Sequence, residues 1–213
     1  MLIVIDGIDG TGKTTQTEYL IKNLKKAGYA VETLDFPHYQ NFFGQMVRQY
    51  LAGEFGNIDQ VDPHLATMLY ALDRWQTKNK IQKWLKQKKV VVLARYTTAN
   101  LIHQAIKVPA SKRADFQNWI ENLEYEILGL PKPDLVVCLY LPARMAYTLI
   151  TKRGRPKDIH EADIMHLNAA ANQALKLCRQ HKTWRLLRCH RGNTILSREE
   201  VAKQLWRLTA PFI

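Results

Sequence analysis

The sequence predicts an α/β fold, a single domain over residues 1–213 built on a doubly wound parallel sheet of about five strands with helices on both faces and a short lid. Short, continuously apolar runs such as "MLIVI" and "VVVLA" are typical of strands that are buried on both faces. Segments with helical spacing separate these runs, so right-handed crossovers join parallel strands. A length of 213 residues suits one compact core.

The expected elements follow in order along the chain. The first strand is Leu2 to Asp6, and after a glycine-rich turn a helix begins near Lys13 and ends before Gly28. A second strand begins at residue 31 and stops at Pro37, because proline cannot continue a central strand. We expect further helices near 44–51, at 63–88, at 111–128, from 143, at 161–180 and from 197, and further strands at 89–93, 134–141 and 184–189.

Composition narrows the class of protein. The longest apolar runs are too short to span a bilayer, so we expect a cytoplasmic protein without a membrane partner. Three widely spaced cysteines indicate free thiols and neither a disulfide framework nor a cysteine zinc site. The net charge of +12 favours anionic ligands, but no helix-turn-helix or zinc-finger spacing is present, so we expect no nucleic-acid partner.

A phosphate-binding loop is the most specific motif. The segment "GIDGTGKT" (7–14) fits the pattern G-x-x-x-x-G-K-[ST] between a strand and a helix. Its glycines let the backbone wrap around phosphates, Lys13 reaches the outer phosphates, and the Thr14 hydroxyl suits Mg²⁺. The motif predicts a nucleoside triphosphate site but leaves GTPases, motor ATPases and small-molecule kinases open. No N-K-x-D segment follows, which disfavours a GTPase.

Four further segments carry a resemblance to one family: "DFPHYQNFFGQMVRQYLAGEFG", "MLYALDRW", "ARYTTANLIHQAIK" and "KRGRPKDIHEAD". In this order, from Leu2 to about Asp163, the chain resembles the thymidylate kinases. The resemblance implies transfer of the γ-phosphoryl group of ATP to dTMP with Mg²⁺, a homodimer, and a lid at about 152–162. The alternatives are a weakened relative that still binds nucleotide, or a kinase for another nucleoside monophosphate or a nucleoside.

The resemblance also implies roles for individual residues. For ATP the matching residues are Gly7, Asp9, Gly10, Thr11, Gly12, Lys13, Thr14 and Thr15, with Thr14 and Asp9 at the metal. For dTMP they are Asp9, Phe36, Tyr39, Tyr70, Arg74, Arg95, Asn100, His103 and Gln104. The implied catalytic residues are Lys13, Asp9, Arg95 and, in the lid, Arg153 and Arg155.

These assignments agree with the chemistry of the side chains. A phosphate monoester suits the planar, bidentate guanidinium of Arg95, and a pyrimidine suits the aromatic face of Tyr70 with polar groups at its edge. The phosphate loop itself carries no arginine, since Gly10 follows Asp9. Lid arginines are therefore expected to neutralise charge as the lid closes.

The sequence departs from the family pattern at Ala94, at Ala99, where a serine is common, and near Ala174, where the family has a tyrosine. The family usually reads aspartate-arginine-tyrosine where this chain has Ala94, Arg95 and Tyr96. The acceptor phosphate has a second pKa of about 6 and needs no general base, so the loss affects positioning. Asp6 or Asp9 could supply the missing charge. From sequence alone we expect Ala94→Asp to raise turnover by about 10- to 100-fold.

Overall fold

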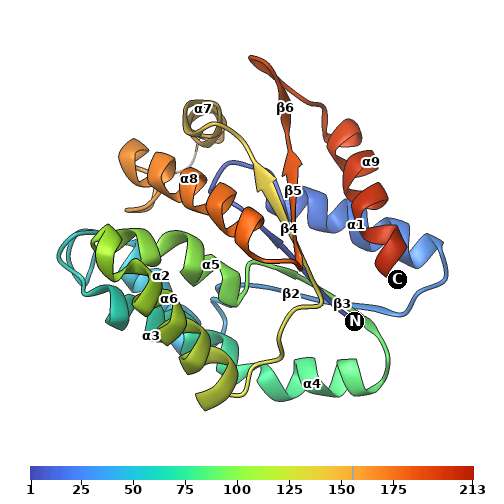
Figure 1. Cartoon of the computed structure of the whole chain (residues 1–213), viewed down its shortest axis with the longest axis horizontal. Coiled ribbons are helices and arrows are strands. Elements are labelled where there is room, and N and C mark those ends of the chain that lie inside the picture. The colour runs from blue at the N-terminus through green and yellow to red at the C-terminus, as the bar shows by residue number, and fades with distance from the viewer. Residues whose placement is uncertain (155) are drawn as a thin grey trace.

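The computed structural model describes residues 1–154 and 156–213 and confirms the predicted fold (Figure 1). Five parallel strands form the central sheet in the order β2-β3-β1-β4-β5. Their bounds are β1 Leu2–Asp6, β2 Val31–Asp35, β3 Val90–Ala94, β4 Leu135–Tyr140 and β5 Trp184–Arg188. The three inner strands are almost wholly buried, which explains their unbroken apolar sequences.

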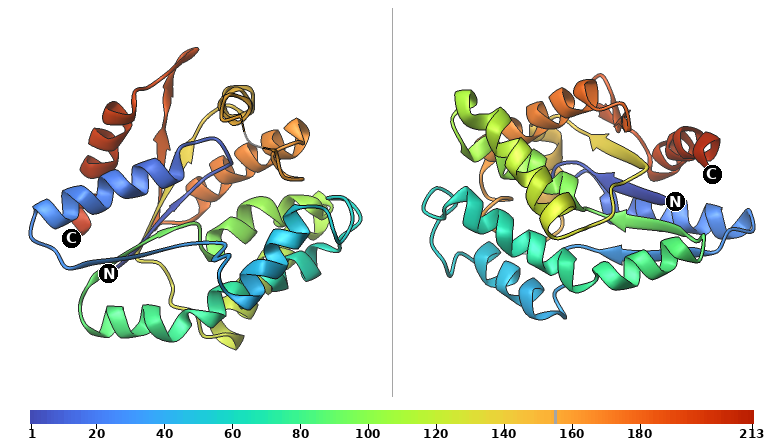
Figure 2. Two further views of the ribbon diagram at one scale, coloured as in Figure 1. Left: turned by 180° about the vertical axis from the view of Figure 1, so that it is seen from behind. Right: turned by 60° about the horizontal axis from the view of Figure 1, so that its bottom comes forward.

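Helices cover both faces of the sheet (Figures 1 and 2). α1 and α9 pack together on one face, and α5 and α8 lie on the other. The helix bounds are α1 Lys13–Lys26, α2 Phe42–Leu51, α3 Pro63–Gln76, α4 Lys78–Lys86, α5 Thr97–His103, α6 Arg113–Glu121, α7 Ala143–Lys152, α8 Ile164–Gln180 and α9 Arg198–Thr209. Among the described helices, none has the length and apolar character to cross a membrane.

The parallel register brings the carboxyl ends of the strands to one edge. Ile5 on β1 pairs with Ala94 on β3, which also pairs with Asp35 on β2. Gly7 turns the chain away from β1 at φ 130°, and a Cβ there would lie 2.2 Å from the carbonyl oxygen of Leu139. Glycine is therefore required at this turn, which opens the phosphate loop directly above the sheet edge.

The prediction of a single helix at 63–88 is wrong, because two helices, α3 and α4, meet at Thr77. The Thr77 hydroxyl and backbone N–H both donate to the carbonyl of Arg74, at 3.0 and 3.1 Å. These bonds replace the regular pattern and end α3. The helix expected at 111–128 is also modified, since α6 passes into a π-helix at Asn122–Ile127.

Neither α5 nor the two-stranded hairpin before α9 was predicted from the sequence. α5 follows β3 after only two residues, and the hairpin of β6 (His190–Arg191) and β7 (Thr194–Ile195) lies before α9. Both are too short to produce a clear periodic pattern. The three cysteines are free, as expected.

Candidate active site

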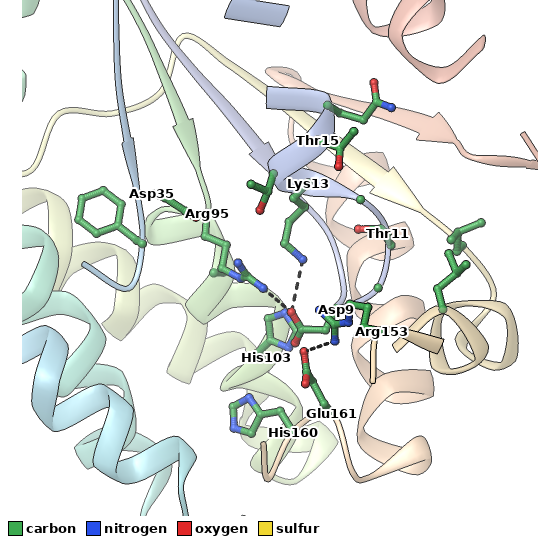
Figure 3. A pocket seen from close by; sticks show the side chains of 18 of the residues that line it. Asp9, Thr11, Lys13, Thr15, Asp35, Arg95, His103, Arg153, His160 and Glu161 are labelled. Carbon is green, nitrogen blue, oxygen red and sulfur yellow. Dashed lines mark hydrogen bonds and ion pairs between the residues drawn. The ribbon is translucent and has the colours of Figure 1, made fainter. Parts of the chain in front are cut away.

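A cleft of about 1050 Å³ lies at the carboxyl edge of the sheet, and Figure 3 shows side chains that line it. Of the residues predicted for the site, the following line it: Asp9, Gly10, Thr11, Gly12, Lys13, Thr14, Thr15, Phe36, Tyr39, Tyr70, Arg74, Arg95, Asn100, His103, Gln104 and Arg153. Gly7 is not among the lining residues, and Arg155 falls outside the described residues.

The phosphate loop joins β1 to α1 at one end of this cleft. Gly12 has φ 85° and directly precedes the first turn of α1, so the amide groups of that turn face the loop. The Lys13 ammonium is buried and donates to the carbonyl oxygens of Gly7 and Ile8, each at 2.8 Å. Burial and the nearby Arg95 lower the pKa of Lys13 to about 8, against the opposing pull of Asp9.

Asp9 links the loop to the rest of the site (Figure 3). Its Oδ1 accepts a hydrogen bond from Arg95 and lies 3.6 Å from the Lys13 ammonium. Burial opposes ionisation of Asp9, but these two cations outweigh it and hold the pKa of Asp9 well below its usual value. Asp9 is therefore an anion that fixes the two cations between the two halves of the cleft.

Arg95 has an unusual backbone conformation for its position directly after β3. Its φ is 59°, in the left-handed region, while its N–H donates to the carbonyl of Ile5 at 3.0 Å. Such a conformation costs about 1–3 kcal/mol and is typical of functional sites. Burial alone would lower the pKa of Arg95, but the carboxylates of Asp9 and Asp35 raise it above its usual value.

Aromatic side chains enclose the other half of the cleft. Phe36 is buried against Tyr96, with ring centroids 6.1 Å apart, and Tyr70 meets Tyr50 edge-to-face at the same separation. Tyr39 is partly exposed and lies under the guanidinium of an arginine on α2. These rings form a slot that suits a planar base and a sugar.

A cluster of three buried polar side chains, Arg74, Glu124 and Asn100, closes this slot. Arg74 donates from Nε and Nη2 to the two carboxylate oxygens of Glu124, each at 2.7 Å, and Asn100 Nδ2 donates to Glu124 Oε1 at 2.8 Å. All three side chains are at least 98% buried. Because a carboxylate accepts hydrogen bonds, it orients the Asn100 amide with its nitrogen toward Glu124 and leaves its oxygen for a ligand.

Sequence reasoning missed Glu124 and Asp35. Glu124 is brought to Arg74 by the π-helix, which a sequence pattern does not reveal. Asp35 lines the cleft as the last residue of β2, the same place that Asp6 has at the end of β1, so the signal is a carboxylate at the carboxyl end of a strand. That signal could have found Asp35.

The segment between α7 and α8, where the lid is expected, carries an ion pair. Arg153 Nη2 donates to Glu161 Oε1 at 2.6 Å (Figure 3). Asp158 Oδ1 accepts from the backbone N–H groups of His160 and Glu161, at 2.9 and 2.8 Å. Burial, with a contribution from Asp9, raises the pKa of Asp158 to about 6.

A doubly wound sheet with a phosphate loop after its first strand, and with a slot for a ring and a phosphate in the other half of the same cleft, defines a nucleotide kinase of the P-loop class. Comparison with known proteins gives the family. The family model described as thymidylate kinase matches residues 5–197. The chain therefore belongs to the thymidylate kinase family.

Individual relatives agree. Thymidylate kinase of Mycobacterium tuberculosis is 36% identical over 169 residues, which cover 76% of this chain and 78% of that protein. The human thymidylate kinase is 31% identical over 140 residues, covering 66% and 60% of the two chains. A solved thymidylate kinase from Candida albicans has a TM-score of 0.78 at 21% identity and covers 99% of this chain and 91% of that one, which supports the fold.

Proposed function

We propose that this protein transfers the γ-phosphoryl group of ATP to dTMP, giving ADP and dTDP, a step toward dTTP. Family membership supports this reaction. The geometric observation that carries it is the Lys13–Asp9–Arg95 cluster, which joins a phosphate loop to an aromatic slot. Nothing in the comparisons favours a weakened relative or a kinase for another monophosphate or a nucleoside.

The half of the cleft that contains the phosphate loop is the donor half, and it binds ATP through that loop. Backbone amides at the start of α1 hold the phosphates, and the Lys13 ammonium neutralises charge on the transferred phosphoryl group. The exposed hydroxyl of Thr14 and the ionised carboxylate of Asp9 are hard oxygen ligands that fit Mg²⁺. When bound, the ion supplies further neutralisation of phosphate charge.

The acceptor half positions the dTMP phosphate at Arg95. Asp9 takes one guanidinium nitrogen, Nη2, and the remaining N–H groups are available to a phosphate. Because the acceptor phosphate is mostly a dianion at neutral pH, attack requires alignment and no general base.

The cluster of Arg74, Glu124 and Asn100 explains a preference for thymine over cytosine. Arg74 keeps donors on Nη1, and Asn100 presents its oxygen as an acceptor. Thymine offers the matching pair, a carbonyl oxygen at position 4 and an N–H at position 3. Cytosine reverses both groups, so its binding would leave buried polar atoms unpaired.

Asp35 compensates for Ala94. Its carboxylate lies close enough to act electrostatically on both Arg95 and Lys13, the two cations of the centre. We assign to Asp35 the positioning of Arg95 that the family aspartate performs elsewhere.

Arg153 is the described arginine of the lid, held by Glu161 beside the cleft. We propose that residues 152–162 act as the lid of a single domain, and that Arg153 and Arg155 approach the transferring phosphates when it closes.

Dimerisation is a further part of the proposal. α3 exposes Leu65, Met68 and Trp75, at 45%, 39% and 45%, and their spacing places them on one helix face. This stripe supports a homodimer, which analytical ultracentrifugation can test. We place the reaction in the cytoplasm, where ATP and dTMP occur, without a nucleic-acid or membrane partner.

The test is a coupled ADP-release assay with ATP, Mg²⁺ and dTMP, dUMP, dCMP or dGMP as acceptor. We expect the highest kcat/KM for dTMP and at least about 100-fold less for dCMP. Equal turnover of dCMP or dGMP would contradict the base assignment. Lys13→Met should fold yet lose about 1000-fold or more in turnover, whereas Lys22→Met, an exposed change on the same helix, should match the parent.

A further inference from the structure

Three histidines meet at the wall of the acceptor half of the cleft. His103 ends α5, His160 lies in the segment before α8, and His166 lies in the first turns of α8. One ring nitrogen from each lies within 4.8 Å of the other two, and all three side chains are buried. Figure 3 shows His103 beside Asp9 with His160 near it.

Two of the ring nitrogens have no hydrogen-bond partner among the residues that the structure describes. His103 Nδ1 and His166 Nε2 are fully shielded from solvent and make no hydrogen bond. An unsatisfied buried nitrogen costs about 1–3 kcal/mol, so two of them on adjoining rings indicate a missing ligand. His160 differs, because its Nε2 lies 2.9 Å from the hydroxyl of Tyr50.

We propose that His103, His160 and His166 form a binding site for a transition-metal ion such as Zn²⁺. Three imidazoles are a recurring ligand set for Zn²⁺ and leave a fourth position open. Mg²⁺ requires oxygen ligands, so this site is distinct from the proposed site of the phosphoryl-transfer metal at Thr14 and Asp9.

The spacing of the rings suits such an ion. With Zn–N bonds of about 2.0–2.1 Å in a tetrahedron, ligand nitrogens lie about 3.3 Å apart, so the three rings need to approach by at most about 1.5 Å. Ring centroids on a shared ion are separated by about 5 Å by the same geometry. The observed separations are 4.6, 5.7 and 6.1 Å.

Positive charges oppose the site: Lys13 and Arg95 act on His103, and Lys107 lies closest to His160. The ammonium of Lys107 donates to the Tyr50 hydroxyl at 2.5 Å and lies 3.4 Å from His160 Nε2. A bound metal ion would repel the Lys107 ammonium, which would keep the Tyr50 hydroxyl as its hydrogen-bond acceptor. This repulsion lowers the affinity for the metal without removing any ligand.

The site would fasten two parts of the fold together. His103 belongs to the helix that follows Arg95, and His160 belongs to the segment that carries Glu161. An ion shared by them would hold the end of the lid segment against α5. Binding should therefore raise the thermal midpoint of the apo protein, with a shift that grows as the logarithm of the ratio of free metal to Kd.

The experiment measures Zn²⁺ binding to untagged, nucleotide-free protein by equilibrium dialysis with metal analysis. The parent should bind one ion, and His166→Ala should weaken its affinity by at least about tenfold, since one of three ligands is lost. His166→Cys should retain binding, because a thiolate also ligates zinc. His181→Ala, at the other end of the same helix, is the matched control and should bind as the parent does.

Co²⁺ provides a second readout in the same variants. The parent should show the visible absorption of tetrahedral cobalt, and His166→Cys should add a thiolate-to-cobalt charge-transfer band that neither the parent nor His181→Ala has. Absence of that band, or equal Zn²⁺ affinity in His166→Ala and the parent, overturns the proposal. No turnover is measured, so the result is independent of the proposed kinase reaction.

Discussion

Asp35 at the end of β2 is the register partner of Ala94 at the end of β3. Partners in adjacent parallel strands point to the same face of the sheet, so the carboxylate lies beside the position where the family carries its aspartate. Burial raises the pKa of Asp35, and the charges of Arg95 and Lys13 act against that rise. A carboxylate therefore lies one strand away from that position and acts on the same two cations.

This relationship changes the expectation for Ala94→Asp. Asp35→Ala should lower turnover by about 10- to 100-fold, because Arg95 loses a carboxylate that positions it. Ala94→Asp alone should give no gain, since two adjacent carboxylates repel each other and one takes up a proton. The double variant Asp35→Ala/Ala94→Asp should regain most of the parent rate. Steady-state kcat at saturating Mg²⁺ measures all three, and a double variant as slow as Asp35→Ala would rule out the exchange.

The sequence predicted the sheet and the phosphate loop because both depend on local signals. Unbroken apolar runs mark strands that are buried on two faces, and the glycines and Lys13 stand at fixed spacing after β1. α5 has only seven residues and begins two residues after β3, so its pattern cannot be separated from a loop. The break at Thr77 depends on one hydroxyl, which periodicity does not detect.

The same limit applies to the site. The predicted residues that line the cleft come from motifs in which neighbours in sequence share a role. Glu124, in contrast, acts through Arg74, which is 50 residues away, and the pairing depends on how α3 meets the π-helix. His166 likewise becomes significant only when α8 packs against α5.

Glu124 is predicted to be a positioning residue for the base pocket. Glu124→Gln removes one charge of a fully buried ion pair and leaves the Arg74 guanidinium without an anion, which should destabilise the protein by about 3 kcal/mol or more. It should also raise the KM for dTMP, since Arg74 and Asn100 lose their fixed orientation, while the KM for ATP stays near that of the parent. Urea unfolding and steady-state kinetics measure the two effects.

Glu126→Gln is the control for this variant. Glu126 pairs with Lys132 on the surface, where such a pair contributes less than about 1 kcal/mol. If Glu124→Gln unfolded at the same urea concentration as Glu126→Gln, or raised both KM values equally, the positioning role would be refuted.

Substitution of Arg153 tests whether the lid supplies a positive charge to the transferring phosphoryl group. Arg153→Ala should lower kcat by about 100-fold or more and change the KM for dTMP by only a few-fold, because charge on the transferring phosphoryl group is greatest in the transition state. Arg144→Ala, an exposed change on α7, should leave both constants unchanged. A rise in KM at constant kcat would mean that the lid arginine only helps the substrate to bind.

Asp158 gives a pH-dependent prediction for stability. Burial raises its folded pKa to about 6, from an unfolded value near 3.8. Between these values the folded state keeps a proton that the unfolded chain has lost, so this group makes the protein less stable as pH rises through the window. Above pH 6 the full cost is present. A shift of this size corresponds to about 3 kcal/mol, which solvent screening at a partly exposed side chain reduces to about 1 kcal/mol.

Asp158→Asn removes the charge while its amide oxygen can still accept from the N–H groups of His160 and Glu161. The variant should therefore be more stable than the parent by about 1 kcal/mol at pH 7.5, and the difference should shrink as pH falls toward 4, close to the unfolded pKa of 3.8, below which the parent side chain is protonated in both states. Asp115→Asn, an exposed change in the first turn of α6, should show no such pH dependence. Urea unfolding of the nucleotide-free proteins from pH 4 to 8 measures this difference, and equal stability at pH 7.5 would show that Asp158 is ionised without cost in the folded state.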